Sequence, residues 1–155
     1  MERTMESFQV FKRTINYYET DRMQVVHHSN YIRFLEECRM HFMKEIGLDY
    51  AEMEKRGVIV PVLSVSCDFV NPVRFGDTIC IVPKLEKLSV VRFEMSYTIY
   101  SEDFKTIHNH ATSSHCFLGD DFKPVRMKRD YADIYEKLQA VEGKELYIVD
   151  TSLEK

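Results

Sequence analysis

The spacing of apolar residues changes from a helical period to a strand period within this chain of 155 residues, and that change restricts the possible folds more than any other feature. Between Asn30 and Ile46 apolar residues recur every three or four positions, which predicts a helix with one apolar stripe. Between Ser64 and residue 118 the period is two, which is typical of strands that bury one face. The stripe consists of Tyr31, Phe34, Leu35, Cys38, Phe42 and Ile46.

Strands are expected before and after this helix. Residues 8–18 are rich in β-branched and aromatic residues and predict a first strand. The later strands are predicted at residues 64–69, 78–88, 91–100 and 105–118. Pro83 cannot donate a ladder hydrogen bond, so it indicates an edge strand or a bulge. The pattern of residues 143–155 does not decide between an extra strand and irregular structure.

The helix ends also have sequence signals. Ser29 or Asn30 can cap the start of the helix over residues 30–46, and Gly47 fits the left-handed position that follows a helix. A short helical turn is expected to end at Gly57, and residues 128–141 predict a closing helix. One early helix followed by consecutive strands predicts a single α+β domain, in which an antiparallel sheet wraps around the central helix.

Composition excludes several classes of protein. The net charge of −4 argues against a general nucleic-acid binder, which needs a basic surface. The apolar runs are too short to span a membrane, and residues 1–14 lack a signal-peptide pattern, so we expect a cytoplasmic protein without membrane contact. The four cysteines are far apart, which predicts reduced, mostly buried thiols.

An aspartate and two histidines precede the predicted helix. Asp21 lies six residues before His27, and His28 adjoins the expected helix start, where backbone N–H groups point at any bound anion. The His28 N–H could polarise a carbonyl group, while Asp21 attacks the same carbon directly or through a water. A capped helix beside a solvated aspartate fits the same spacing.

The stretch YETDRMQVVHHSNYIRFLEECR, residues 18–39, resembles the signature of the 4-hydroxybenzoyl-CoA thioesterase-like branch of the hotdog-fold superfamily. In that resemblance Asp21 matches the catalytic carboxylate, and His28 matches the residue whose backbone N–H faces the thioester oxygen. Later motif positions match Tyr31, Glu36 and Arg39. Residues 61–82 are similar to the family's second and third strands, so the likeness covers about residues 8–140.

The resemblance implies one hotdog domain over residues 1–155 that hydrolyses an acyl-CoA thioester to a free acid and coenzyme A. It also implies a homodimer or homotetramer with the active sites near the subunit interface, and no cofactor, because coenzyme A is part of the substrate. A carrier-protein substrate, or a module that binds acyl-CoA without cleaving it, stays open.

Two positions complicate the assignment of the family's site residues to this chain. Gln24 occupies a position where the family usually has glycine, so Gln24 could narrow the pocket, add an amide donor or change the path of the loop. Glu36 lies nine residues after His27, the spacing of the catalytic acid in a sister branch. The imidazoles of His27 and His28 are expected to fill space or orient the loop rather than to act as bases.

The expected contacts to the substrate form two groups. Near Asp21 they are Gln24, Val26, His27 and Tyr31, and in the basic run of residues 123–129 they are Arg126 and Lys128. The basic run fits either a solvated surface or a dock for the phosphates of coenzyme A. His108, His110 and His115 share one predicted strand, but His115 has the opposite parity, so no metal site is expected.

Overall fold

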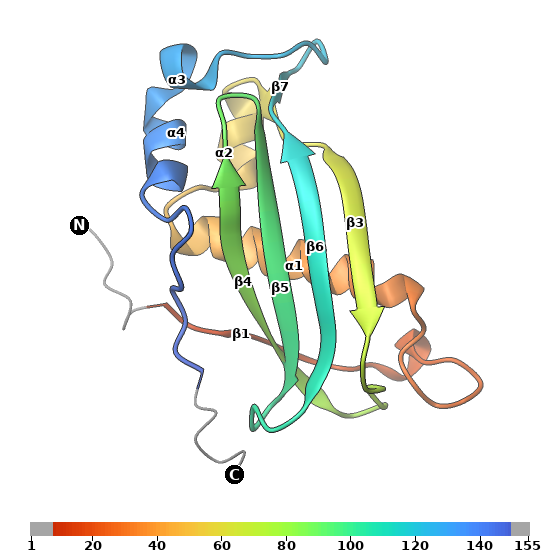
Figure 1. Cartoon of the computed structure of the whole chain (residues 1–155). Helices are drawn as coiled ribbons and strands as arrows, with labels where there is room; N and C mark the ends of the chain where they lie inside the picture. The colour runs from red at the N-terminus through yellow and green to blue at the C-terminus, as the bar shows by residue number, and fades with distance from the viewer. Residues whose placement is uncertain (1–7, 150–155) are drawn as a thin grey trace.

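The computed structural model describes residues 8–149 and contains a five-stranded antiparallel sheet in the order β1-β4-β5-β6-β3 (Figure 1). Its strands are β1 (Phe11–Thr14), β3 (Val62–Phe69), β4 (Thr78–Leu88), β5 (Arg92–Ser101) and β6 (Ile107–Cys116). A separate two-stranded sheet pairs β2 (Val58–Ile59) with β7 (Leu118–Gly119). The predicted α+β class and the antiparallel sheet are therefore confirmed.

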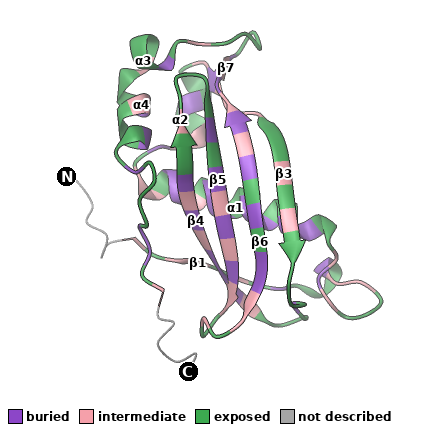
Figure 2. Ribbon diagram, viewed as in Figure 1, coloured by how far each residue is buried: buried purple, intermediate pink, exposed green. Residues whose placement is uncertain are grey.

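The central helix α1 spans Ser29–Glu45 and crosses one face of the sheet (Figure 1). Its apolar stripe is buried against the strands, and buried and exposed residues alternate along β5 and β6 because only one face of the sheet meets the helix (Figure 2). The remaining helices are η2 (Tyr17–Glu19), α2 (Tyr50–Lys55), α3 (Met127–Asp130) and α4 (Ala132–Gln139). The position of the central helix was predicted to within one residue at each end.

The expected cap of α1 is wrong in detail. His28 occupies the N-cap position with helical backbone angles, and Ser29 is already the first helical residue. The Ser29 hydroxyl lies 2.8 Å from His27 Nδ1, and the Asn30 amide bonds elsewhere, so neither side chain caps the helix. Gly47 follows the helix with φ +88°, as expected of a left-handed terminus.

The closing helix of residues 128–141 was predicted as continuous but is broken at Tyr131 (φ −138°, ψ 49°), between α3 and α4. The Tyr131 hydroxyl donates to the Arg56 carbonyl at 2.8 Å, and the Arg56 guanidinium lies over the Tyr131 ring. These contacts to the loop after α2 hold Tyr131 in a non-helical conformation, which a helical period cannot reveal.

One strand prediction also needs correction. The first strand is only β1, because η2 follows it at Tyr17. β4 lies between β1 and β5, but β1 pairs only with Thr78–Ile81, so Pro83 sits where β4 has lost that neighbour. The bulge in β4 lies further along, between Leu85 and Lys87. The segment of residues 143–149 forms no strand, and residues 150–155 lie outside the described residues.

A chain of polar side chains crosses the core beneath α1. Arg39 donates to the Tyr97 hydroxyl at 3.1 Å, Tyr97 shares a hydrogen bond of 2.7 Å with Ser113, and Ser113 Oγ lies 2.7 Å from His115 Nε2. Glu36 and Arg39 are neighbouring motif positions in the sequence. In the structure the Arg39 guanidinium points into the core, where it bonds to Tyr97. Burial, together with the nearby Arg39 cation, lowers the pKa of His115 to about 3.

Three turns share one backbone conformation. Gln24, Phe104 and Phe122 have φ near +60°, and each donates its N–H to the carbonyl three residues earlier. Glycine or asparagine is usual at such positions, because a side chain costs about 1–2 kcal/mol there. Gln24 thus keeps the backbone path that the family's glycine would take, and its side chain is exposed.

None of the helices within residues 8–149 combines the length and the apolar character that crossing a lipid bilayer requires. All four cysteines are free: Cys38 and Cys80 are buried, while Cys67 and Cys116 are half-buried.

We expect that replacing His115 with glutamine reduces the loss of stability in acid. The folded-state pKa of His115 lies below that of an unfolded histidine, so unfolding takes up a proton between about pH 6.5 and pH 3. His115 therefore destabilises the fold as the pH falls through this window. Urea unfolding of His115→Gln should depend on pH less steeply than that of the wild type, by up to about 1.4 kcal/mol per pH unit.

The matched control is His110→Gln, which removes an exposed imidazole from the opposite face of β6 and should keep the wild-type slope. Equal slopes for His115→Gln and the wild type between pH 6 and pH 4 would contradict a buried neutral histidine.

The positive φ of Gln24 predicts that glycine stabilises this turn. Gln24→Gly should raise the free energy of unfolding by up to about 1 kcal/mol. Glycine removes the strain of the positive φ, and this gain exceeds the entropic cost of a more flexible unfolded chain. Gln24→Val should lower the free energy of unfolding, since a β-branched residue fits this region poorly. The control is Met23→Gly, an exposed neighbour without positive φ, which should destabilise; equal losses for both glycine variants would contradict the strain.

Candidate active site

The residues from Thr20 to Val26 form a tight hairpin in front of α1 (Figure 1). Thr20 pairs with Val26, and the Asp21 N–H donates to the Val25 carbonyl at 2.8 Å. Val26 in turn donates its N–H to the Val73 carbonyl at 2.8 Å, which ties the hairpin to the turn between β3 and β4. The hairpin therefore returns the chain to the helix start within a few residues of Asp21.

The Asp21 carboxylate is half-buried and partly engaged. Its Oδ1 accepts the Met23 N–H at 2.8 Å, which fixes the direction of the carboxylate. Its Oδ2 has no hydrogen-bond partner within residues 8–149. One carboxylate oxygen is thus held in place while the other is available to a ligand or to water.

The start of α1 presents an unpaired donor next to this carboxylate loop. The His27 N–H donates to the Glu19 carbonyl at 2.9 Å, but the His28 N–H has no acceptor among the described residues. The two imidazoles stack at 4.2 Å, and His27 Nδ1 accepts the Ser29 N–H at 3.2 Å. The N–H of His28 therefore lies at the positive end of a helix of 17 residues.

A buried carboxylate holds the base of the hairpin. The backbone carbonyl of Glu19 accepts both the His27 N–H and, at 2.8 Å, the amide Nδ2 of buried Asn30. The Glu19 side chain accepts from Arg13 at 2.5 Å and from the Asn16 N–H at 2.8 Å. Burial alone would raise the pKa of Glu19, but these hydrogen bonds outweigh it and lower the pKa.

Arg13 joins this carboxylate to the central helix. Its Nε donates to Glu37 at 2.6 Å, and its guanidinium lies 4.3 Å from the centre of the Phe34 ring. Sequence reasoning missed Arg13 and Glu19 and assigned Asn30 only to the cap. The spacing Asn16-x-x-Glu19 is a capping-box pattern and could have revealed Glu19, since Asn16 and Glu19 do form that box.

A hollow of about 250 Å³ adjoins the hairpin. It is lined by Val25, Val26, Tyr31, Phe69, Val70, Asn71 and Pro72. The Tyr31 and Phe69 rings meet edge-on at 5.0 Å, so its wall is largely aromatic and aliphatic. Burial raises the pKa of Tyr31 to about 12, which keeps its hydroxyl protonated at neutral pH.

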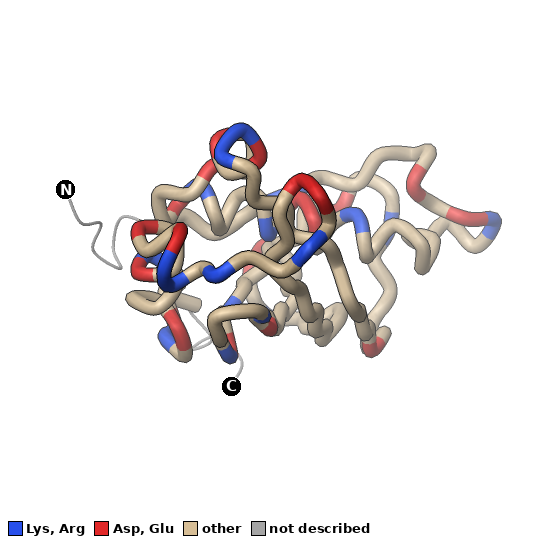
Figure 3. The backbone as a smooth tube through the Cα atoms, turned by 90° about the horizontal axis from the view of Figure 1, so that it is seen from above, with Lys and Arg blue, Asp and Glu red and all other residues tan. Residues whose placement is uncertain are grey.

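The predicted site residues divide into two groups. Val26 and Tyr31 line the hollow, and Asp21, Gln24, His27 and His28 belong to the hairpin or the helix start. Arg126 and Lys128 do not join them, because α3 lies at the opposite end of the same protomer (Figure 1). Basic and acidic residues are interspersed along the backbone (Figure 3). Glu36 is exposed on α1 and lines neither this hollow nor the larger one.

A larger hollow of about 380 Å³ lies beside β4 and the segment of residues 145–149. Lys84 there pairs with Glu86 and Glu145, so the charges in it satisfy one another. His108 and His110 face away from α1 while His115 faces it, and no three histidine, cysteine or carboxylate side chains of residues 8–149 gather as a metal site. The smaller hollow is therefore the candidate active site.

Comparison with known proteins identifies the family of the chain. Residues 15–136 match the family model of the thioesterase-like superfamily. A candidate acyl-CoA thioesterase of Bacillus subtilis is 32% identical over 79% of this chain and 91% of its own length. A chloroplastic acyl-acyl carrier protein thioesterase of Arabidopsis thaliana is 22% identical over 79% of this chain and 65% of its own length.

The likeness extends to solved structures. The crystal structure of a DHNA-CoA thioesterase from Staphylococcus aureus superposes with a TM-score of 0.77 at 29% identity, over 84% of this chain and 90% of that one. The chain therefore belongs to the thioesterase-like superfamily of hotdog-fold thioester hydrolases.

Proposed function

We propose that the protein hydrolyses acyl-CoA thioesters at the hairpin of residues 20–26. The observation that supports this most directly is the pairing of a fixed carboxylate with an unpaired N–H at the start of a long helix, beside an apolar hollow. Thioester hydrolysis needs a nucleophile or base and a donor for the developing oxyanion, and little else.

In the proposed reaction the thioester carbonyl oxygen accepts the His28 N–H, and the acyl group occupies the hollow that includes Val26 and Tyr31. Asp21 either attacks the carbonyl carbon, forming an anhydride as the carbon–sulfur bond breaks, or removes a proton from an attacking water. Water cleaves the anhydride in the first case. Both routes give a carboxylic acid and coenzyme A and require no metal or redox cofactor.

The unpaired edge of β3 supports a homodimer, on its own or within a tetramer. Within residues 8–149, β3 is the last strand of the sheet on this side, and it exposes Val62, Leu63 and Phe69. A free edge with apolar side chains is prone to pair with another strand, and a second copy offers the same edge. Sedimentation of the purified protein tests this, and a monomer at micromolar concentration would exclude it.

A carrier-protein substrate is the second candidate, and the similarity to a carrier-protein thioesterase of Arabidopsis thaliana favours it. The chemistry at Asp21 and His28 would be the same. Comparing the hydrolysis of one acyl group on coenzyme A and on acyl carrier protein distinguishes the two substrates.

Asp21→Asn should reduce kcat at least about 10³-fold, because the amide can neither attack nor accept a proton. The amide oxygen can still accept the Met23 N–H, so the hairpin should keep its conformation. The measurement is thiol release from short-chain, long-chain and aromatic acyl-CoAs, with unfolding curves to verify the fold.

The matched control is Glu36→Gln, which neutralises an exposed carboxylate of α1 and should keep kcat near the wild-type value. If Glu36→Gln is inactive and Asp21→Asn is active, the helix carboxylate is the essential group. If the wild type cleaves neither coenzyme A nor carrier-protein thioesters, the proposed function is wrong and a binding module remains.

A further inference from the structure

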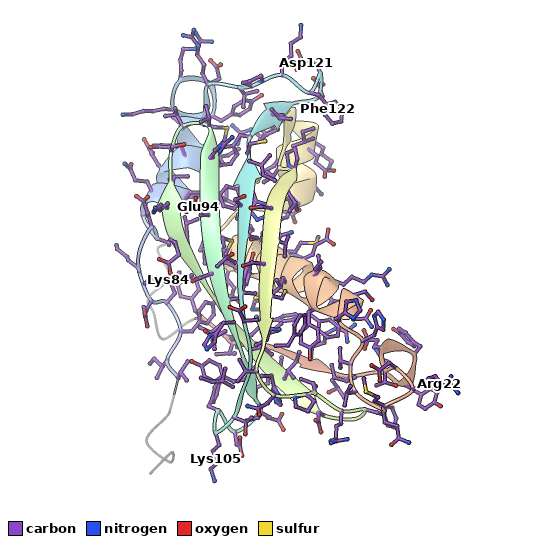
Figure 4. All side chains as sticks on the ribbon, turned by 45° about the vertical axis from the view of Figure 1, so that its right-hand side comes forward. Arg22, Lys84, Glu94, Lys105, Asp121 and Phe122 are labelled. Carbon is purple, nitrogen blue, oxygen red and sulfur yellow. The ribbon has the colours of Figure 1, made fainter. Side chains whose placement is uncertain are left out.

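The two ends of β3 carry different parts of the molecule. At its start, β3 follows β2, and β2 pairs with β7, so the hairpin of residues 119–123 that follows β7 lies at this end. At its other end, Phe69 forms the wall of the hollow beside the Asp21 hairpin. Figure 4 places Asp121 and Phe122 at the top of the molecule and Arg22 near the bottom. Within one protomer the two hairpins are therefore remote from each other.

A two-fold axis across the free edge reverses this separation. Two copies of the same edge strand related by a two-fold axis pair antiparallel, so the start of β3 in one copy meets the end of β3 in the other. The hairpin of residues 119–123 in one protomer is then brought to the Asp21 hairpin of its partner.

Hydrogen bonds within residues 119–123 close this second hairpin, but no aromatic contact to the Phe122 ring is found within residues 8–149. Phe122 occupies the left-handed position that glycine usually fills, and 73% of the residue is exposed. Backbone strain and an exposed aromatic ring both carry a cost, and packing within the described chain offsets neither. A contact outside the protomer would offset both costs.

The charges of the two hairpins are complementary. Asp120 and Asp121 precede Phe122 and Lys123 follows it, so acidic residues outnumber basic ones in the hairpin of residues 119–123. Arg22 lies at the tip of the Asp21 hairpin, and Arg74 lies in the turn that pairs with Val25. Within residues 8–149 the side chains of Asp120, Arg22 and Arg74 are exposed and form no ion pair. Tyr17, Met23 and Phe75 beside these arginines expose apolar surface that an aromatic ring can cover.

We propose that in the dimer the hairpin of residues 119–123 closes the active site of the partner protomer, with Phe122 covering the Asp21 hairpin and Asp120 facing Arg22 and Arg74. The inference rests on the proposed hydrolase and its dimer. Phe122 acts as a positioning residue that excludes water and confines the acyl group, so each active site is complete only in the assembly.

Phe122→Gly is the direct test, because glycine keeps the turn and removes only the ring. It should lower kcat/KM at least about tenfold without lowering the free energy of unfolding. Phe104→Gly is the matched control, since Phe104 has the same φ in the turn between β5 and β6 and packs against Tyr100 of its own chain. It should leave kcat/KM unchanged; an unchanged kcat/KM for Phe122→Gly overturns the proposal.

Mixed dimers decide whether the hairpin acts on its own chain or on the partner. Co-expressed Asp21→Asn and Phe122→Gly subunits with different tags can be purified as heterodimers. If the hairpin serves the partner, one site of each heterodimer carries both changes and the other is intact, so roughly half the wild-type activity returns. Activity no higher than half that of the Phe122→Gly homodimer overturns the proposal.

A cross-link measures the same contact without any substrate. Oxidation of Met23→Cys mixed with Phe122→Cys should give a disulfide-linked dimer, whereas Met23→Cys mixed with Phe104→Cys should not. An absent cross-link in the first mixture overturns the proposal. A cross-link in a protein that cleaves no thioester would instead refute the proposed function while keeping the contact.

Discussion

Burial of the apolar stripe of α1 is the constraint on which the rest of the structure depends. The stripe covers one face of β4 and β5, and this contact fixes which residues of each strand point inward. It also places the first turn of α1 near the free edge of the sheet, where β3 ends. The carboxylate hairpin, the unpaired His28 N–H and the hollow are therefore adjacent because one helix has to be covered.

Hydrogen bonds of Glu19 and Arg13 then position the hairpin relative to α1 and the sheet. The Glu19 carbonyl accepts one bond from the His27 N–H, just before the helix, and one from the Asn30 side chain in the helix. Arg13 links the Glu19 side chain to Glu37. These bonds couple the hairpin to α1 without using the Asp21 carboxylate or the His28 N–H. A rigid scaffold with a bonded loop is the usual way to hold catalytic groups at fixed separation.

Periodicity predicted α1 and the long strands because burial of one face leaves a repeating pattern in the sequence. Predictions from the local sequence failed where a residue far away in the sequence determines the conformation. The break at Tyr131 depends on Arg56, the failure of the Asn30 cap depends on Glu19, and the turn of Arg39 into the core depends on Tyr97. The resemblance indicated Asp21 and His28, but it could not show that Gln24 adopts the glycine conformation or that Arg126 lies far from Asp21 in the same chain.

The short reach of β1 has a consequence for the order of folding. Beyond Ile81 the edge of β4 has no β1 residue beside it, and the Gly143 N–H bonds there to the Leu85 carbonyl at 2.7 Å. Phe8 and Tyr147, from opposite ends of the described chain, meet edge-on at 6.0 Å. During synthesis this part of the β4 edge therefore stays open until Gly143 has left the ribosome, so the core closes here only after the whole five-stranded sheet has been made.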